Sequence, residues 1–566
     1  MPAFLQRLRS FLAGPTPAHS PTASTPLHPA WFVVGVSLWF AVICNVTLWR
    51  ELWALPDVNG WRGLGFTLGF MGLIAGANVA VFSLLTWGRA LKPVLVLLVL
   101  TATFGAYFML SYGIVIDSTM LVNVAQTDPG EASDLLNWRM LVALVLLALP
   151  PLWWLLRRPV RALGWWRQIL HGVLLIAAGL AVAALCLMLV FQDFASTMRN
   201  HTKLRYLINP LNSVYALVDL GSKPFQMDMG SLQPLGRDAR LGSSYAQQTK
   251  PPLLVLVLGE TARSMNFTLN GYERPTTPLL SARNDITSAP NAWSCGTSTA
   301  ASVPCMFSHM TRSEFNNRKA NYEGLLDVLL HAGLAVVWVD NQAGCKGVCD
   351  RLTEISTGKL SDPQWCPGGE CQDPIMLRDL DAHIAALPAE RRARGVVVVM
   401  HQMGSHGPAY AKRSLPAQKR FTPECLSNAL QQCSREQVLN AYDNSIVATD
   451  LLLNQTIEWL QARASQAQTA MLYVSDHGES LGENNLFLHG LPYAVAPDEQ
   501  KNVPWITWLS PAMQERTGVT TACLQRDQAS RRILHDNYFH SVLGLLDVRT
   551  TAYLPARDVF AACRGH

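Results

Sequence analysis

Four apolar stretches in the second half of the chain each end in polar side chains that could bind a metal ion or a phosphate. The residues that follow these stretches are Glu260, Asp340, His401 and the pair Asp476–His477. Apolar stretches of this length are typical of parallel strands buried on both faces of a sheet. In open α/β sheets, ligands bind beyond the carboxyl ends of the strands. The sequence therefore predicts that separate segments bring Glu, Asp and His side chains to one sheet edge, as in a metal site for an oxyanion substrate.

A loop rich in small hydroxyl residues, SCGTSTAASVPCMFS at 294–308, contains a candidate nucleophile. Thr299 lies at its centre, and Ala300 and Ala301 favour the start of a helix there. The free backbone N–H groups and the positive dipole end of a helix stabilise both an alkoxide and an incoming phosphate. The alternative is that Thr299 or Thr297 only caps the helix.

A threonine hydroxyl needs a base or a metal ion before it becomes a good nucleophile. Zinc lowers the pKa of a bound hydroxyl and can hold it in line with phosphorus. Glu260, Asp476 and His477 offer oxygen and nitrogen ligands that suit zinc, and Thr299 would complete a tetrahedron. We therefore expect one tightly bound Zn²⁺, and the sequence leaves open a second zinc during catalysis.

Two histidines and a lysine in glycine-punctuated loops are candidates for contact with the substrate. His406 and His489 could each bind a substrate phosphate or a second metal, or could simply face water. Lys346 follows Gly344-Cys345 and could neutralise a phosphate as a point charge, or could be an ordinary solvated lysine.

The first third of the chain is a membrane domain by composition. Hydrophobic residues are 49% of the chain and charged residues only 15%. Spanning a bilayer takes about 20 apolar residues. Five segments meet this requirement, at approximately 30–49, 65–88, 93–116, 138–156 and 168–192. Buried core helices are the alternative, but five in so short a stretch would leave little amphipathic surface.

Loop charges and cysteines agree on the orientation. Arg7, Arg9, Arg89 and Lys92 and the cluster within 157–167 lie on one side of the expected spans. The positive-inside rule then places the N-terminus in the cytoplasm and everything after about residue 195 outside the inner membrane.

Ten of the twelve cysteines lie in that outer part, and their close spacing predicts disulfides in an oxidising compartment rather than a thiolate metal cluster. The pairs expected are Cys295–Cys305, Cys345–Cys349, Cys366–Cys371, Cys425–Cys433 and the distant pair Cys523–Cys563.

The order of segments predicts four regions. Residues 1–29 are a cytoplasmic leader, 30–192 the transmembrane domain, 193–250 a linker with bridging helices, and 251–566 the periplasmic catalytic domain. In the last region, short strands alternate with helix-like stretches at 319–332, 373–387 and 437–463, which predicts a mostly parallel sheet. The net charge of +5 is too mild and too dispersed to indicate a nucleic-acid partner.

These motifs together resemble the lipid A phosphoethanolamine transferases, a family that includes the mobile colistin-resistance enzymes and belongs to the alkaline phosphatase-like superfamily. The resemblance covers the catalytic domain and extends to the five-span membrane domain. It is carried by GETAR (259–263), NGYERPTTP (270–278), the 294–308 loop, KGVCD (346–350), HQMGSHGPAY (401–410), and SDHGESLGE (475–483) with His489.

The resemblance implies roles for individual residues. Glu260, Thr299, Asp476 and His477 match the zinc ligands, and Thr299 also matches the nucleophile. Lys346, His406 and His489 match phosphate-binding or second-metal positions, and Gln342 a substrate contact where some members have Asn. Asn123, Thr127 and Glu131 match positions for the headgroup of the donor lipid, and their spacing would place them on one helix face.

The activity implied is a two-step transfer of phosphoethanolamine from phosphatidylethanolamine to a lipid A phosphate by a monomer, with polymyxin resistance as its consequence. His406 or His489 would be the general acid. A core sugar or a protein as acceptor, or a donor that delivers phosphoglycerol, are the alternatives. A sulfatase activity is not expected, because the segment at Thr299 lacks the C-x-P-x-R or S-x-P-x-R motif. A silent receptor would have lost a ligand or the nucleophile.

Overall fold

The computed structural model describes residues 25–126, 135–226, 228–246, 248–358, 360–367 and 370–564, which form two compact units. The first unit comprises the described part of Met1–Thr103 together with Ala143–Ser196. The second comprises Phe104–Val142 and Thr197–His566, without the residues outside the described ranges. Because Phe104–Val142 packs with the C-terminal part, the units do not follow the four regions expected from the sequence, and those boundaries remain a proposal.

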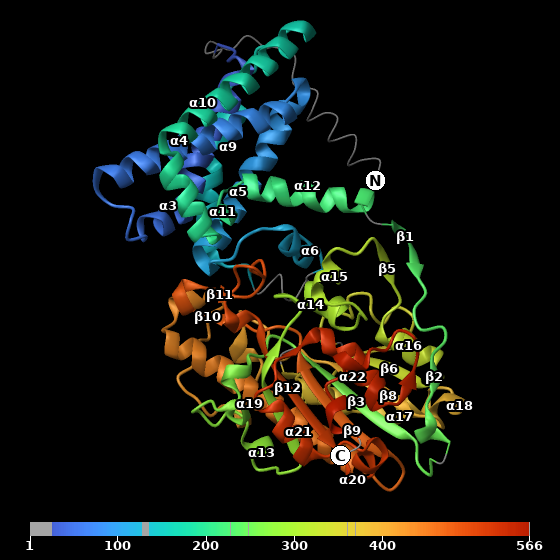
Figure 1. Cartoon of the computed structure of the whole chain (residues 1–566). Coiled ribbons are helices and arrows are strands. Elements are labelled where there is room, and N and C mark those ends of the chain that lie inside the picture. Colours follow the sequence, from blue (N-terminus) through green and yellow to red (C-terminus); the bar gives the residue numbers. More distant parts are fainter. Residues whose placement is uncertain are drawn as a thin grey trace. The chain divides into compact units, whose positions relative to one another are not determined.

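The first unit is helical (Figure 1). Its main helices are α2 (Pro29–Trp39), α3 (Val46–Trp53), α4 (Gly60–Leu85), the first part of α5 (Leu91–Tyr112), α9 (Leu149–Arg157) and α10 (Trp165–Asn200). Helix α4 meets α10 at two glycines, and a Cβ on Gly76 would lie 2.6 Å from the carbonyl oxygen of Gly179. Small residues of this kind let membrane helices approach closely.

Four of the described helices are long and apolar enough to cross a membrane, and the bent pair Pro29–Cys44 and Val46–Trp53 would make a fifth. Large apolar side chains are exposed along this unit, for example Leu146 at 62% and Leu189 at 74%. Such a surface suits lipid rather than water. This agrees with the α-helical membrane domain expected from composition.

The second unit is built on an eight-stranded sheet in the order β13-β4-β12-β9-β3-β8-β6-β7. The strands in that order are Ile533–Leu534, Ile286–Trp293, Asn502–Leu509, Gln468–Ser475, Pro252–Gly259, Val396–His401, Ala335–Asp340 and Thr353–Ser356. All neighbours pair in parallel except β12, which is antiparallel to both β9 and β4. The mostly parallel α/β sheet predicted from the apolar stretches is confirmed.

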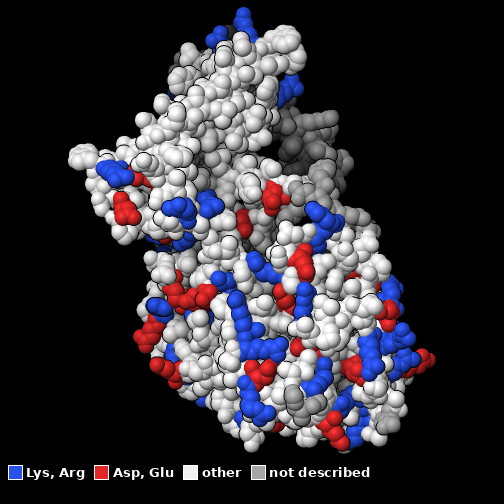
Figure 2. All heavy atoms as spheres, viewed as in Figure 1, with Lys and Arg blue, Asp and Glu red and all other residues white. Residues whose placement is uncertain are grey.

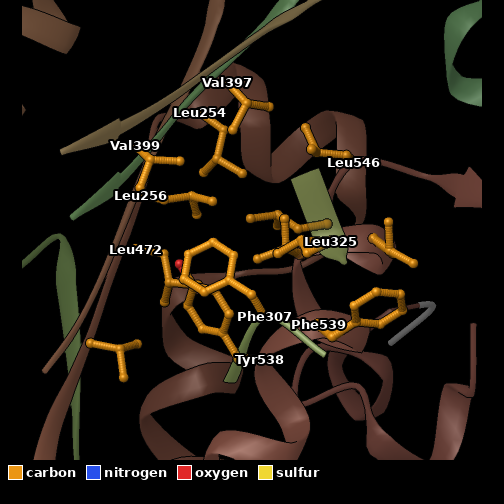
Figure 3. Packing of buried hydrophobic residues seen from close by; sticks show 14 of the residues in the cluster. Leu254, Leu256, Phe307, Leu325, Val397, Val399, Leu472, Tyr538, Phe539 and Leu546 are labelled. Atoms are coloured by element: carbon orange, nitrogen blue, oxygen red, sulfur yellow. The ribbon is translucent and has the colours of Figure 1, made fainter. Parts of the chain in front are cut away.

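Helices cover both faces of this sheet. On one face, alternate side chains of β3, β8 and β9 pack against Phe307, α16 (Leu325–His331) and α22 (Tyr538–Leu545), as Figure 3 shows. The intervening residues of β3 are also buried, and α19 (Arg435–Gln461) contacts β9. Burial on both faces explains why these strands are apolar throughout rather than alternating.

The other described α-helices of the second unit are all shorter than α19. They are α6 (Ser118–Gln126), α8 (Trp138–Ala143), α11 (Lys203–Tyr206), α12 (Leu211–Gln226), α13 (Pro278–Ser281), α14 (Thr299–Met306), α15 (Arg312–Asn316), α17 (Leu380–Ala385), α18 (Ala389–Arg392), α20 (Pro511–Thr517) and α21 (Thr521–Gln528). The helix expected at 319–332 begins only at Leu325, because Ala320–Tyr322 forms strand β5 against β1 (Asp228–Gln233). Helix α6 packs on both α12 and α14.

Five disulfides lie in the second unit. They join Cys295 to Cys305, Cys345 to Cys349, Cys366 to Cys371, Cys425 to Cys433 and Cys523 to Cys563, the same pairs that the spacing predicts.

Candidate active site

The carboxyl ends of β3 and β9 bring three metal-binding side chains together. Gly259 and Ser475 are register partners on these neighbouring parallel strands, so the residues that follow them leave the sheet side by side. The ligand atoms of Glu260, Asp476 and His477 lie within 4.8 Å of one another, and all three residues are fully buried. The convergence follows from parallel pairing, since two adjacent strands ending at one edge deliver their next residues to one place.

His477 presents one ring nitrogen to this cluster. Its Nδ1–H donates to the carbonyl oxygen of Gly478 at 2.9 Å, which leaves the lone pair of Nε2 for a ligand. Nε2 lies 3.4 Å from Glu260 Oε1 and 3.3 Å from Asp476 Oδ2. The other carboxylate oxygen of Asp476 is held by the backbone N–H groups of His477 (2.7 Å) and Thr261 (3.2 Å), so its orientation is set by the strand end.

Thr299 completes this group from a separate segment. It is the first residue of α14, and its hydroxyl donates to Glu260 Oε2 at 3.0 Å and lies 3.5 Å from His477 Nε2. The side chain is only 4% exposed. The first N–H groups of a helix have no partner within the helix, so the start of α14 offers donors and a positive potential beside the hydroxyl.

The 294–308 loop is tied to the end of β9, which positions Thr299. Ser302 donates to the carbonyl oxygen of Asp476 at 2.5 Å, and the Cys295–Cys305 disulfide closes the loop. His535 links the same two parts, because its Nδ1 accepts from the N–H of Cys295 and its Nε2 lies 3.0 Å from Ser475 O. Burial lowers the pKa of His535 to about 4, so this ring is neutral and acts as a structural hydrogen-bonding link.

The backbone at Gly404 and Ser405 lies close to Glu260. Gly404 has a φ of +53°, and a Cβ there would lie 2.7 Å from the carbonyl oxygen of Glu260. The N–H of Ser405 donates to that same oxygen at 3.1 Å. Only glycine fits this position without displacing Glu260.

Two further histidines extend from the cluster. The ring centroid of His489 lies 4.3 Å from that of His477, and the ring of His406 lies 5.6 Å from that of His489. His489 Nδ1 is 3.4 Å from Glu479 Oε2. Burial, followed by the neighbouring charges of His489 and Arg413, lowers the pKa of His406 well below its usual value, so His406 is neutral.

One of the other candidate residues belongs to this centre. Gln342 donates to Glu260 Oε2 at 2.7 Å and so belongs to the cluster. Lys346 lies four residues further on in the turn closed by Cys345–Cys349, and its Nζ donates to Ala343 O at 3.1 Å. Asn123 is in α6, the helix that packs on α14. Thr127 and Glu131 lie outside the described residues.

The sequence places Asp340 and His401 at the same sheet edge as the metal-binding residues, but in the structure they form a buried pair with each other. They are the last residues of β6 and β8. Burial lowers the pKa of His401, but the hydrogen bond and charge of Asp340 and the charges of Glu260 and Asp476 raise it. The net pKa of His401 is therefore raised. Glu479 is also fully buried near the site, where it faces His489, and the sequence assigned it no role. The sequence showed that Asp340 and His401 each end an apolar strand. It did not show that β6 pairs with β8, which is what brings Asp340 and His401 together.

A sulfatase-like α/β domain with a carboxylate, histidine and threonine cluster at its strand ends, joined to apolar helices, defines a membrane-associated member of the alkaline phosphatase-like superfamily. A family model described as sulfatase matches residues 252–548, and one described as phosphoethanolamine transferase EptA/EptB matches residues 74–225. The chain belongs to the phosphoethanolamine transferase family.

Several relatives support this membership over most of their length. Phosphoethanolamine transferase EptA of Escherichia coli is 36% identical over 94% of this chain and 97% of its own. Phosphatidylethanolamine transferase Mcr-1 of Escherichia coli is 36% identical over 92% and 95%. The solved structure of lipooligosaccharide phosphoethanolamine transferase A from Neisseria meningitidis matches with a TM-score of 0.89 and 33% identity, covering 95% of this chain and 99% of that one.

Proposed function

We propose that this chain transfers phosphoethanolamine from phosphatidylethanolamine to a phosphate group of lipid A through a covalent phosphoethanolamine–threonine intermediate at Thr299. The observation that carries the proposal is the convergence of the Thr299 hydroxyl with Glu260, Asp476 and His477. The names of the similar proteins supply the transferred group, and those of Mcr-1 and the Neisseria meningitidis protein support the donor and a lipooligosaccharide acceptor.

The four converging side chains fit a zinc ion, which we propose as the cofactor. Two carboxylates buried beside each other in the absence of water repel strongly, and a divalent cation offsets this repulsion. The set of two carboxylates, one imidazole nitrogen and one hydroxyl suits zinc. When bound, zinc would act as a Lewis acid that lowers the pKa of the threonine hydroxyl and withdraws charge from the phosphoryl group.

In the first half-reaction, Thr299 Oγ1 forms a bond to phosphorus and the bond from phosphorus to the diacylglycerol oxygen breaks. Glu260 Oε2, 3.0 Å from the hydroxyl, is placed to accept the threonine proton. The leaving alkoxide needs a proton. His489, whose Nδ1 lies 3.4 Å from the Glu479 carboxylate, is the donor that we propose, and burial keeps His406 neutral.

In the second half-reaction, an oxygen of a lipid A phosphate attacks the same phosphorus, and Thr299 leaves and regains its proton. Lys346, Gln342 and the two histidines would bind the phosphate oxygens and offset the charge that develops there.

Asn123, with Thr127 and Glu131, would contact the ethanolamine headgroup of the donor, since a carboxylate attracts its ammonium. The added group lowers the negative charge that attracts cationic peptides, which would give polymyxin and colistin resistance.

The same proposal includes a location. Loop charges favour an inner-membrane protein with a cytoplasmic N-terminus and a periplasmic catalytic domain. Five disulfides in the second unit suit an oxidising compartment.

Mass spectrometry of lipid A from cells that express the full chain tests this function. Wild type should add phosphoethanolamine to lipid A and lower polymyxin susceptibility, and Thr299→Ala should do neither. Thr297→Ala is the matched control, because Thr297 is a buried neighbour whose hydroxyl donates to Leu491 O. Phosphoethanolamine found only on the core sugars would reject the lipid A acceptor, and modification by Thr299→Ala would reject the threonine intermediate.

A further inference from the structure

The first unit contains a pocket that the proposed transfer reaction does not use. Its volume is about 320 Å³, and it lies where four segments meet: the chain before α2, the turn between α4 and α5, the α9–α10 connection and the first turns of α10. Backbone hydrogen bonds hold its wall, since Leu27 N–H donates to Pro159 O at 3.0 Å and Arg161 N–H donates to Leu27 O at 2.8 Å. The volume falls within the usual range for small-ligand sites, roughly 300–1,000 Å³.

The polar side chains of this pocket are hydrogen-bond donors and cations. Arg89, Arg161, Gln168 and two histidines line it. The rings of His28 and His171 meet edge to face with centroids 4.8 Å apart. His28 Nδ1 accepts the N–H of Ala30 at 3.2 Å, so the proton of the neutral ring is on Nε2 and can be donated. Such a lining favours an anion.

The surrounding charge has one sign. Segments 86–92 and 157–172 contain six Lys or Arg residues and no Asp or Glu. Figure 2 shows blue without red at the top of the helical unit, near the start of α10. Two of these cations are engaged elsewhere, because Lys92 Nζ donates to Leu156 O and Arg157 stacks over Trp153. Arg89 and Arg161 are the two that line the pocket.

Apolar and aromatic residues accompany these cations. Val33, Leu91, Leu163 and Leu175 also line the pocket, with Trp87 beside them. Trp165 and Trp166 at the start of α10 are 67% and 74% exposed. Tryptophans in this setting are typical of the headgroup level of a membrane. A ligand that carries both an anion and an apolar part matches this lining better than a free inorganic anion.

We propose that this pocket binds the phosphate of an anionic phospholipid, with Arg89, Arg161 and His28 as donors and the leucines in contact with the glycerol and first acyl carbons. The site is separate from the residues of the transfer reaction, and the proposal does not depend on that reaction. By the orientation inferred from loop charges, the lipid would belong to the cytoplasmic leaflet.

Lipid binding to the purified full chain tests this assignment. The chain in neutral detergent is titrated with phosphatidylglycerol or phosphatidylcholine, and bound lipid is counted by native mass spectrometry. Arg89→Gln/Arg161→Gln should weaken phosphatidylglycerol binding by roughly tenfold or more. The matched control Arg158→Gln/Arg167→Gln removes the same charge from the same cationic segments, 86–92 and 157–172, but not from the pocket lining, and should leave binding near wild type.

A variant that fills the pocket without changing its charge tests lipid binding independently of the arginines. Gly172 lines the pocket, and a Cβ there would be 3.5 Å from the Trp87 ring, an ordinary contact. The backbone therefore accepts a side chain at 172, and Gly172→Leu should occupy part of the pocket and reduce phosphatidylglycerol binding without any change of charge. Equal losses in the two double-arginine variants, or an unaffected Gly172→Leu, would overturn the proposal. Displacement of the lipid by inorganic phosphate or glycerol phosphate at the same concentration would assign the pocket to a soluble anion instead.

Discussion

Asp340 and His401, the last residues of the neighbouring strands β6 and β8, share a buried hydrogen bond of 2.7 Å between Oδ1 and Nδ1. Asp340 also accepts the N–H of Gly344 at 2.9 Å, in the loop that carries Gln342 and Lys346. Burial raises the pKa of Asp340, but the hydrogen bond and charge of His401, together with the hydrogen bonds from Gly344 and Trp338, make the net pKa lower than usual. This aspartate therefore joins a buried histidine beside the cluster to the loop of two proposed substrate-binding residues.

Removal of both members of this pair should cost less than the sum of the two single removals. We expect Asp340→Asn to lower the free energy of unfolding by about 3 kcal/mol, because it leaves a buried histidine without its charged partner. The double variant Asp340→Asn/His401→Gln should lose clearly less than the sum of the single losses. Thermal unfolding of the full chain in detergent measures this, and additive losses would show that the two residues are not coupled.

Zinc content should separate His477 from His489, although their rings are adjacent. His477 offers Nε2 to the carboxylates, whereas His489 faces Glu479. His477→Gln should bind zinc at least about tenfold more weakly in competition with a chelator, because a direct ligand is lost. His489→Gln should retain zinc and lose turnover. Full zinc occupancy in His477→Gln under the same competition would remove this residue from the ligand set.

The metal-binding residues at the strand ends were predictable from the sequence, because buried parallel strands are apolar throughout and the polar residue that ends each one is easy to recognise. Glu260 and the pair Asp476–His477 follow such strands, and the structure brings them together. The Asp340–His401 pair required knowledge that β6 lies beside β8, which no local pattern states. The antiparallel insertion of β12 between β9 and β4 was hidden for the same reason.

Long-range packing also explains the differences at helices and domain limits. Ala320–Tyr322 lies before a helical stretch but is extended, because it pairs with a strand almost a hundred residues earlier in the chain. Residues 104–142 are part of an apolar region by sequence, yet their described part (104–126 and 135–142) packs with the C-terminal unit, and α6 contacts α14. Composition measures what a segment prefers to contact, and does not identify the partner.

Loss of the Cys523–Cys563 disulfide should reduce stability more than loss of Cys295–Cys305, and loss of Cys295–Cys305 should reduce activity more. Loop-closure entropy favours the bond that closes the longer loop: about 3 kcal/mol for Cys295–Cys305, with a separation of 10, and about 4 kcal/mol for Cys523–Cys563, with a separation of 40. Replacing both cysteines by serine should thus destabilise the chain more at 523/563. Turnover should fall more at 295/305, because that bond closes the loop of Thr299. Thermal unfolding and lipid A modification of both variants give the two rankings, and equal turnover would show that the 295–305 bond does not position Thr299.

Asp450 should make the second unit less stable as the pH rises from about 4 to about 6. Its two carboxylate oxygens accept the N–H groups of Leu279 and Leu280 at 2.9 Å, at the start of α13. Burial raises its pKa from 3.8 to about 6, against the opposing effects of these hydrogen bonds and of Arg420. Because the unfolded chain releases this proton first, ionisation favours unfolding between the two pKa values. The cost is absent below pH 3.8, grows to about 3 kcal/mol, and is complete above about pH 6.

Asp450→Asn isolates this contribution, because asparagine has nearly the same shape and does not titrate. The variant loses one acceptor at all pH values, so the difference in stability between variant and wild type, rather than either value alone, carries the information. Relative to wild type, the variant should become more stable as the pH rises through this window. Unfolding of the full chain in detergent at pH 4, 5, 6 and 7 measures the difference. A difference that is constant with pH would mean that Asp450 is ionised throughout, with its charge satisfied by the N–H groups at the start of α13.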